Sequence, residues 1–269
     1  MEVDHIDTDE RTPMDTITIN RSTCVGCSLC INDCPGSCLY LEDGSAHRYE
    51  GGGCIECGHC YAICPTNSIR MTNYACEDEP VVSMTEIDSD TLLAAMRSRR
   101  TIRHYTDAPI EREKLDTILE AGRHAPTGAN AQNVSFTILG SKKAEAESIC
   151  VNLFRKALRL ASPLVPQLKR MAINDAFFFK DAPEVIIISS KSPINAGLAS
   201  AYMEIEANSL GLGVLYSGFF VACSRLSRKL RRLLDLPRGH SVQTCMVIGY
   251  PAVKYQRIAP KKPAHVRTL

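Results

Sequence analysis

The stretch CVGCSLCINDCP occupies residues 24–35, and CIECGHCYAICP occupies residues 54–65. Both follow the spacing C-x2-C-x2-C-x3-C-P, so the chain carries one cysteine-rich unit twice. In each unit three cysteines are separated by two residues, a fourth follows after a longer gap, and a proline then redirects the chain. This repeat decides how the first part of the chain folds.

Cysteine and charge are unevenly distributed over the 269 residues. Ten of the 13 cysteines lie in residues 1–76. Residues 1–90 hold 4 Lys and Arg against 17 Asp and Glu, a net charge of −13, whereas residues 91–269 have a net charge of +14. We therefore expect two domains, 1–76 and 91–269, joined by the acidic, non-periodic segment 77–90.

The composition is that of an ordinary soluble protein, with 45% hydrophobic and 23% charged residues. It excludes a disordered chain, a collagen and a coiled coil. The apolar runs, such as Val185–Ile188, are far shorter than the roughly 20 residues of a membrane helix. The first 30 residues show no secretory signal pattern, so we expect a cytoplasmic protein.

The cysteine spacing suits an iron–sulfur cubane, because a tight loop can wrap three thiolates around three irons. Over about residues 15–75 the chain resembles the bacterial two-[4Fe–4S] ferredoxin domain, with Ile17–Ile19 and Ser37–Leu41 as short strands. In that domain the fourth cysteine of each unit binds the other cluster. The resemblance implies one cluster on Cys24, Cys27, Cys30 and Cys64, and a second on Cys54, Cys57, Cys60 and Cys34.

Zinc and disulfides are the alternatives for these cysteines. Zinc prefers a single closed set of four ligands, which gives no reason for two identical units. Disulfides require an oxidising compartment, and nothing in the sequence exports the chain. We expect His59 to be a polar loop residue, and Cys38 and Cys76 to be buried thiols without a ligand role.

The second domain alternates helix-type and strand-type patterns, which predicts a layered α/β or α+β fold. We expect helices and strands at Thr91–Met96, Ile110–Ala121, Val134–Leu139 (strand), Ala144–Leu160, Glu184–Ser190 (strand), Ala196–Leu210, Ser224–Leu234 and Val242–Ile248 (strand). The segment Ser162–Lys180 contains two prolines and the Phe177–Phe179 cluster, so we expect a lid over a pocket.

The nucleotide-binding motifs of other folds are missing or incomplete. There is no Walker A pattern, and the pair Gly211 and Gly213 is followed by Tyr216 where a dinucleotide fingerprint needs glycine. The two glycines also suit the end of a helix. The run RSRRTIR at residues 97–103 could clamp a phosphate through its four guanidinium groups. A basic helix end is the alternative explanation.

Four segments in order resemble the nitroreductase family of FMN enzymes, from about residue 88 to 269. They are SRRTIRHY at residues 98–105, APTGANAQ at 125–132, LGLG at 210–213 continuing to Phe220, and IGYPA at 248–252 followed by PKKP at 260–263. The resemblance implies an α+β domain that dimerises and binds FMN where the subunits meet. The expected fold class is therefore α+β, a two-cluster ferredoxin-like domain followed by a nitroreductase-like FMN domain.

The same resemblance implies roles for particular residues. The phosphate and ribityl chain would be held by Arg99, Arg100, Thr101, Arg103 and Lys261. The flavin ring would be lined by Pro126, Thr127 and Asn130, from the partner subunit, and would face backbone N–H groups of Ser217, Gly218 and Phe219. The chain departs from the family at Thr101, Asn133 and Phe219, where Ser, Pro and Gly are common, and the bulk of Phe219 puts the accepted substrate size in doubt.

Together the two halves indicate a flavin oxidoreductase. Electrons would enter through the two clusters, from ferredoxin or NAD(P)H, and leave to a small nitroaromatic, quinone or enone. The alternative is an electron-transfer module that serves a partner protein, and the reverse, dehydrogenating direction also stays open. His104, His124 and Tyr216 are candidate proton donors, but no catalytic residue is assigned. With no Trp in the chain, nucleic-acid binding is disfavoured.

Overall fold

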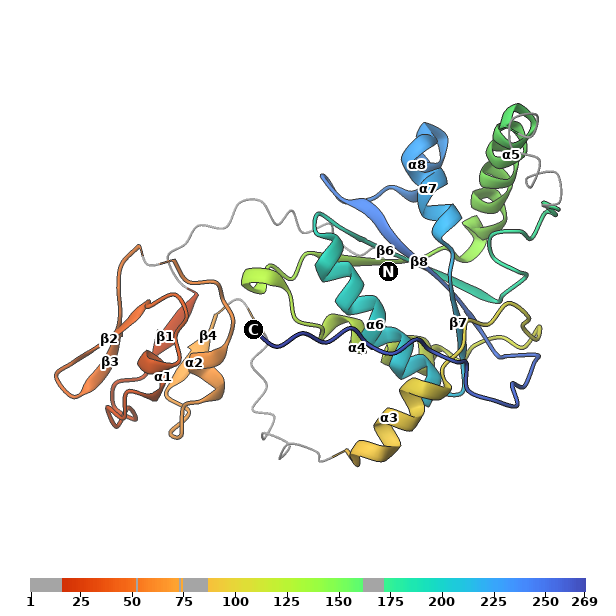
Figure 1. Ribbon diagram of the computed structural model, residues 1–269. Coiled ribbons are helices and arrows are strands. Elements are labelled where there is room, and N and C mark those ends of the chain that lie inside the picture. The colour runs from red at the N-terminus through yellow and green to blue at the C-terminus, as the bar shows by residue number, and fades with distance from the viewer. Residues whose placement is uncertain (1–15, 52, 73, 75–86, 162–171) are drawn as a thin grey trace. The chain divides into compact units, whose positions relative to one another are not determined.

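The computed structural model describes residues 16–51, 53–72, 74, 87–161 and 172–269. The chain divides into two compact units, residues 1–86 with 129–131, and residues 87–128 with 132–269 (Figure 1). Within the described residues, no helix has the length and apolar character needed to cross a membrane. Most of the expected linker, and Cys76, lie outside the described residues.

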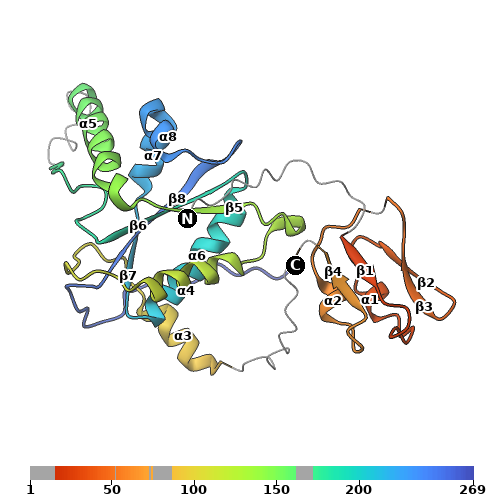
Figure 2. The same cartoon turned by 180° about the vertical axis from the view of Figure 1, so that it is seen from behind.

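The first unit consists of two small sheets and two helices of one turn each (Figure 2). Strand β1 (Ile17–Ile19) pairs antiparallel with β4 (Ile69–Met71), and β2 (Leu39–Glu42) pairs antiparallel with β3 (Ser45–Arg48). Helices α1 (Leu29–Asn32) and α2 (His59–Ala62) each begin one residue before the third cysteine of a repeat. The core of this unit gathers Cys30, Leu39, Ala46, Cys60 and Ile69, so two of the cysteines are part of the core.

The second unit is built around a four-stranded sheet with the order β5-β6-β8-β7, in which every pair is antiparallel. The bounds are β5 (Val134–Ile138), β6 (Glu184–Ser190), β7 (Gly213–Tyr216) and β8 (Ser241–Gly249). Figure 1 shows α4 (Arg112–Arg123) and α6 (Pro193–Ser209) on one face. The other face carries α5 (Lys143–Ala161), α7 (Gly218–Leu226) and α8 (Arg228–Leu234).

Residue alternation along the central strands builds a core on each face of this sheet. Val185 and Ile187 point to the side of α5, α7 and α8. Their neighbours Ile186 and Ile188 point to the side of α4 and α6. All four side chains are fully buried, which explains why β6 is a continuous apolar run. The fold class expected from the sequence is therefore confirmed.

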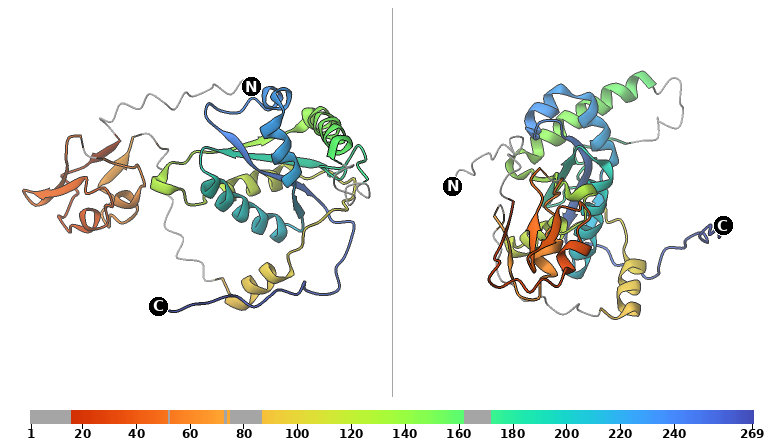
Figure 3. Two further views of the ribbon diagram at one scale, coloured as in Figure 1. Left: turned by 45° about the horizontal axis from the view of Figure 1, so that its top comes forward. Right: turned by 90° about the vertical axis from the view of Figure 1, so that its left-hand side faces the viewer.

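Helix α3 (Ser89–Ser98) opens the second unit. It begins two residues earlier than the sequence pattern indicates, because the Asp88 carboxylate accepts a hydrogen bond from Thr91 N at 2.8 Å and caps the helix. Figure 3 shows this helix next to the C-terminal segment that follows β8. The two segments meet at a cavity described below.

Three sequence-based expectations need correction. The single basic helix expected at Ser224–Leu234 is two helices, α7 and α8. They separate at Ser227, whose extended backbone ends the first helix and whose hydroxyl accepts a hydrogen bond from Leu230 N to cap the second. Strand β7 was missed, since its four residues follow a glycine-rich turn and give too short a signal.

The third correction concerns the expected lid. Residues 162–171 lie outside the described residues. The described end of the segment is part of the core, with Phe178 and Phe179 buried. Their backbone N–H groups each donate a hydrogen bond of 2.9 Å to Glu147 Oε1 on α5. This end of the segment is therefore anchored to the domain.

Candidate functional site

The first unit contains two cavities lined by thiols. The first cysteine cavity brings together Cys24, Cys27, Cys30 and Cys64. The second cysteine cavity brings together Cys34, Cys54, Cys57 and Cys60, and Cys38 is a fifth cysteine in its lining. Each takes three cysteines from one repeat and the fourth from the other, which is the exchange expected from the sequence. Cys38 is buried beside Cys34, and that burial raises the pKa of its thiol to about 11.

Backbone N–H groups point at several of the lining sulfurs. Ala46 N donates to Cys24 Sγ at 3.4 Å, Cys38 N donates to Cys34 Sγ at 3.3 Å, and Ser68 N donates to Cys64 Sγ at 3.2 Å. Such donors stabilise negative charge on sulfur, which is the charge state of a cluster ligand. The four motif thiols of each cavity, with donors aimed at several of their sulfurs, fit two cubane clusters.

The two cysteine cavities differ in the side chains beside the fourth thiol. Thr66 Oγ1 lies 3.6 Å from Cys64 Sγ and 2.7 Å from Ser68 Oγ. The position equivalent to Thr66 in the first repeat is Gly36, which has no side chain to donate. Burial opposes the effect, but the hydrogen bonds from Ser68 and Thr66 lower the pKa of Cys64. The first cysteine cavity therefore has one more potential donor to its fourth thiol.

In the second unit, the segment after α3 is held against the edge of β7. Thr101 bridges to Val214, and Ile102 N donates to Val214 O at 3.0 Å. Glycine is needed at position 213, because a Cβ there would lie 2.3 Å from the Ile102 side chain. This close approach fixes the backbone from which Thr101 and Arg103 project. Gly211, with φ of 77°, follows the end of α6, as expected of a helix cap.

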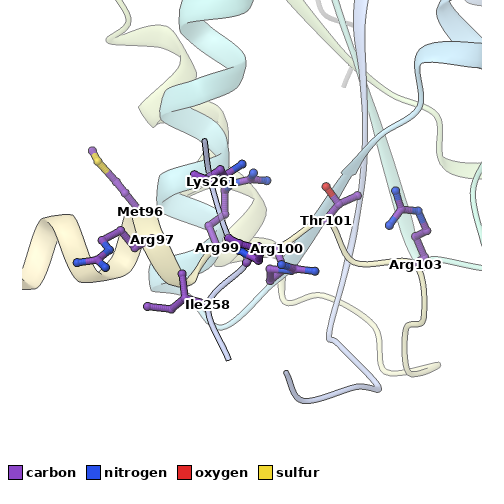
Figure 4. Close-up of a pocket in the computed structure, with 10 residues that line it drawn as sticks. Met96, Arg97, Arg99, Arg100, Thr101, Arg103, Ile258 and Lys261 are labelled. Atoms are coloured by element: carbon purple, nitrogen blue, oxygen red, sulfur yellow. The ribbon is translucent and has the colours of Figure 1, made fainter. Parts of the chain in front are cut away.

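A cavity of about 790 Å³ opens between α3, this segment and the C-terminal chain. We call it the arginine cavity, and its lining residues are Met96, Arg97, Arg99, Arg100, Thr101, Arg103, Ile258, Ala259, Pro260 and Lys261. Figure 4 shows Arg99, Arg100 and Lys261 close together, with Arg97 and Arg103 on either side. Among the described lining residues there are five cations and no carboxylate, so the cavity suits a polyanionic group such as a phosphate.

Two of these cations are held in place by neighbours. Arg99 Nη1 donates to Glu204 Oε1 of α6 at 2.8 Å, and the Glu204 side chain is only 11% exposed. The guanidinium of Arg100 lies 4.8 Å from the ring centroid of Tyr255, in a cation–π contact. Both guanidinium groups are therefore oriented before any ligand binds.

A second cavity, of about 540 Å³, lies along β7 and the start of α7. We call it the aromatic cavity, and its lining residues are Arg103, Phe177, Phe178, Lys180, Leu215, Tyr216, Ser217, Gly218 and Phe219. Arg103 lines both cavities. An elongated ligand with an anionic end and an aromatic end could therefore occupy both.

Of the other residues expected at the site, Tyr216 lines the aromatic cavity and the rest lie outside the linings of both cavities. Pro126, Thr127 and Asn130 lie in the loop after α4 and line neither cavity, so their expected role depends on a second subunit. His124 is exposed and pairs with Glu120 at 2.9 Å. Tyr216 donates through its hydroxyl to Ser200 O at 2.7 Å, and its pKa is raised by burial, so its proton is already engaged.

Comparison with known proteins identifies the second unit. Residues 96–250 match the nitroreductase family, over more than half of the chain. The chain belongs to the nitroreductase family. Residues 16–65 match the 4Fe-4S dicluster domain. This nitroreductase therefore carries an N-terminal ferredoxin-type domain, as the sequence resemblance indicates.

Curated relatives and solved structures agree with this division. The chain is 28% identical over 190 residues to an FMN reductase (NAD(P)H) from Bacillus subtilis, covering 64% of this chain and 69% of the relative. Its N-terminal part is 40% identical over 67 residues to ketoisovalerate oxidoreductase subunit VorC from Methanothermobacter marburgensis, covering 22% of this chain and 85% of the relative. An FMN-dependent nitroreductase from Clostridium difficile shares the fold, with a TM-score of 0.53, 22% identity and coverage of 67% and 100%.

This member of the nitroreductase family is thus a flavin oxidoreductase whose cofactors are FMN and [4Fe–4S] clusters. Its own geometry fits both cofactors. The arginine cavity has the charge that the FMN phosphate requires, and the two cysteine cavities have the ligand number of cubane clusters. Sequence reasoning missed Glu204, for which no short motif gives a signal. Phe177 and Lys180 belong to the segment that was expected to cover a pocket, and both line the aromatic cavity.

Proposed function

We propose that this nitroreductase reduces a small organic electrophile of the nitroaromatic, quinone or enone type, using electrons that reach FMN through the two clusters. The observation that carries the proposal is that Arg103 lines both the arginine cavity and the aromatic cavity, so the two cavities adjoin at this residue. The phosphate end of FMN would bind Arg99, Arg100 and Lys261. The flavin would extend past Thr101 and Arg103 toward the aromatic cavity.

When bound, FMN exchanges electrons singly with clusters and in pairs with organic molecules. The protein's part is to bind and orient. In the proposal, backbone N–H groups of Ser217, Gly218 and Phe219 face the flavin and stabilise charge on it, an electrostatic role that needs no side chain. The cysteines of the two cysteine cavities hold the clusters, and ferredoxin or NAD(P)H supplies the electrons.

The aromatic cavity favours an enzyme over a pure electron-transfer module. A relay between proteins needs a docking surface, whereas this cavity of about 540 Å³ is of the size and character typical of small-molecule sites. Phe177 and Phe219 supply apolar walls, and Arg103 and Lys180 supply polar ends. This combination of apolar walls and polar ends favours a small organic acceptor beside the flavin over a protein partner.

We further propose that the nitroreductase acts as a homodimer. Ile194, Leu198, Tyr202 and Ile205 are exposed along α6, at helical spacing, with exposed fractions between 38% and 73%. An apolar stripe of this kind on a helix suits burial against a second copy of the chain. The partner would also supply Pro126, Thr127 and Asn130 to the flavin, the residues that the single chain leaves outside its cavities.

Anaerobic stopped-flow absorbance on the holoenzyme tests the proposal. Reduced ferredoxin and NAD(P)H are offered separately, and flavin bleaching is followed before and after addition of nitrobenzene, a quinone or an enone. Bleaching by reduced ferredoxin, followed by reoxidation on addition of an acceptor, supports a cluster-fed reductase. Fast bleaching by NAD(P)H alone, with no acceptor able to reoxidise the flavin, would contradict it and favour the electron-transfer module.

A further inference from the structure

The aromatic cavity holds two cations that have no carboxylate opposite them. Arg103 and Lys180 line it, and among the described lining residues there is neither Asp nor Glu. Lys180 Nζ lies 4.6 Å from the ring centroid of Phe177, over its face. Arg103 also lines the arginine cavity, to which the FMN phosphate is assigned, whereas Lys180 lines only the aromatic cavity, so the charge of Lys180 is left for another anion.

The wall next to Lys180 is aromatic. The rings of Phe177 and Phe219 are 6.0 Å apart between centroids, and Phe154 packs behind both at 5.6 Å and 5.1 Å. Phe219 is 51% exposed, which is unusual for a phenylalanine and leaves its ring available to a ligand. A flat apolar group can pack on this wall while an attached anion reaches the cations.

The segment that carries Phe177 and Lys180 is held rigidly. Glu147 on α5 accepts the hydrogen bonds from Phe178 N and Phe179 N, and Lys143 Nζ donates to Ala182 O at 2.7 Å and Pro183 O at 2.9 Å. Lys180 itself has a left-handed backbone, with φ of 55°, which this clamp maintains. The fold therefore fixes the side from which the Lys180 ammonium approaches the cavity.

We infer that the aromatic cavity selects acceptors that carry a carboxylate on a planar unsaturated or aromatic group. The carboxylate would bind Lys180 and Arg103, and the planar group would pack against Phe177 and Phe219. This inference rests on the proposed function, because it names the substrate class of the same site.

The electrostatic surroundings of Lys180 agree with an anionic ligand. Burial and the charge of Arg103 lower the pKa of Lys180, while Glu147 and Asp181 act in the opposite direction. The Glu147 carboxylate is engaged by two backbone N–H groups and lies outside the set of cavity-lining residues. An anion placed between Lys180 and Arg103 would relieve their mutual repulsion.

The test compares benzoate with benzamide, which has the same shape but no charge. Binding of each to the FMN- and cluster-loaded protein is measured by isothermal titration calorimetry and by perturbation of the flavin absorbance. We expect benzoate to bind about tenfold more tightly than benzamide, as a charge-assisted hydrogen bond would give. The Lys180→Met variant should lose most of this preference, Lys180→Arg should retain it, and the exposed-lysine variant Lys229→Met should behave as wild type.

A second measurement compares acceptors, as the ratio of kcat/KM for 4-nitrobenzoate to kcat/KM for nitrobenzene. Lys180→Met should lower this ratio about tenfold. Equal binding of benzoate and benzamide, or a ratio unchanged by Lys180→Met, would overturn the inference and leave the proposed function intact if nitrobenzene is still reduced. Loss of FMN from Lys180→Met would also overturn it, by making Lys180 a cofactor ligand. Failure to reduce any acceptor would count against the proposed function itself.

Discussion

Arg99 Nη1 donates a hydrogen bond of 2.8 Å to Glu204 Oε1. The bond joins the arginine-rich run at residues 97–103 to α6. The contact links residues 105 positions apart in the sequence. It holds one guanidinium edge and leaves the other N–H groups of Arg99 free to turn toward the arginine cavity. A carboxylate that orients a cation, without lining the cavity, therefore prepares the site for a phosphate.

Replacing Arg99 by alanine should affect both stability and FMN binding. The change leaves the nearly buried Glu204 without its cation, and we expect a loss of about 1–3 kcal/mol in the free energy of unfolding, less than for a fully buried pair because Arg99 is 32% exposed. The FMN dissociation constant should rise about tenfold or more. Fluorescence titration with FMN measures it, with the exposed Arg228→Ala as control. Unaltered FMN affinity in Arg99→Ala would remove Arg99 from the phosphate site.

The exchange of cysteines between repeats predicts which substitutions remove a cluster. Cys64→Ser should lose about half of the iron, as Cys64 serves only the first cysteine cavity. Cys38→Ser should keep all of it, because Cys38 is the counterpart of Ser68, and serine is already tolerated at that place in the other repeat. Iron and sulfide analysis of anaerobically purified protein checks both. Iron loss in Cys38→Ser equal to that in Cys64→Ser would show that Cys38 is a ligand.

The Thr66 hydroxyl should raise the reduction potential of the cluster in the first cysteine cavity. A hydrogen bond to a ligand sulfur favours the more negative, reduced cluster. Thr66→Val removes the hydroxyl with little change in shape. If the lost hydrogen bond stabilises the reduced cluster by about 1 kcal/mol, the reduction potential should fall by about 40 mV for the transfer of one electron. Redox titration followed by electron paramagnetic resonance measures this shift. The cluster in the second cysteine cavity is the internal control, and an equal shift of both clusters would argue against a local effect.

Glu147 should make the stability of the second unit depend on pH. Burial raises its pKa above the usual 4.5, against the opposing hydrogen bonds from Phe179 N and Phe178 N. The folded protein therefore keeps this proton to higher pH than the unfolded chain. The stabilisation that the protonated Glu147 carboxyl gives to the folded state is fully present below about pH 4.5. It is lost as the pH rises through the raised pKa of the folded protein.

Two variants separate the charge of Glu147 from its hydrogen bonds. Glu147→Gln keeps an oxygen acceptor and should remove this pH dependence. Glu147→Ala leaves two backbone N–H groups without an acceptor and should cost about 2–4 kcal/mol at every pH. Urea unfolding between pH 4 and pH 8 gives the comparison. A parallel pH profile in wild type and Glu147→Gln would mean that Glu147 does not titrate in this range.

A charge on the exposed stripe of α6 should prevent dimer formation. Leu198→Asp puts a carboxylate at the centre of the stripe, where burial against a second copy would be costly. We expect a monomer with weakened FMN binding, as measured by light scattering after size-exclusion chromatography and by flavin content. Leu226→Asp, on the 75% exposed side chain at the end of α7, is the matched control. A Leu198→Asp protein that keeps the mass of a dimer would place the interface elsewhere.

The sequence was most informative where chemistry demands a fixed local spacing. The resemblance to two-cluster ferredoxins predicts the same division of the eight motif cysteines that the two cysteine cavities show, and the spacing within each repeat sets three of the four ligands. The arginine-rich run at residues 97–103 could be recognised because its cations lie close together in the sequence. Glu204 could not be found, because its role depends on packing with Arg99, which is far away in the sequence. The break between α7 and α8 was missed since Ser227 is a single capping residue inside a periodic apolar pattern.

The exchange of cysteines between the two repeats also determines how far apart the first unit would hold its two clusters. Cys30, in the first cysteine cavity, lies in α1, and Cys34, in the second, follows one turn later. Cys60 and Cys64 repeat this arrangement in reverse order around α2. Two short helices thus act as rigid spacers between the metal centres. The x3 gap of each motif sets the spacing of its third and fourth cysteines, and so of the two clusters that they would hold. Inserting one residue there would turn the fourth cysteine by about 100° around the helix axis and move its thiol away from the cavity that it lines.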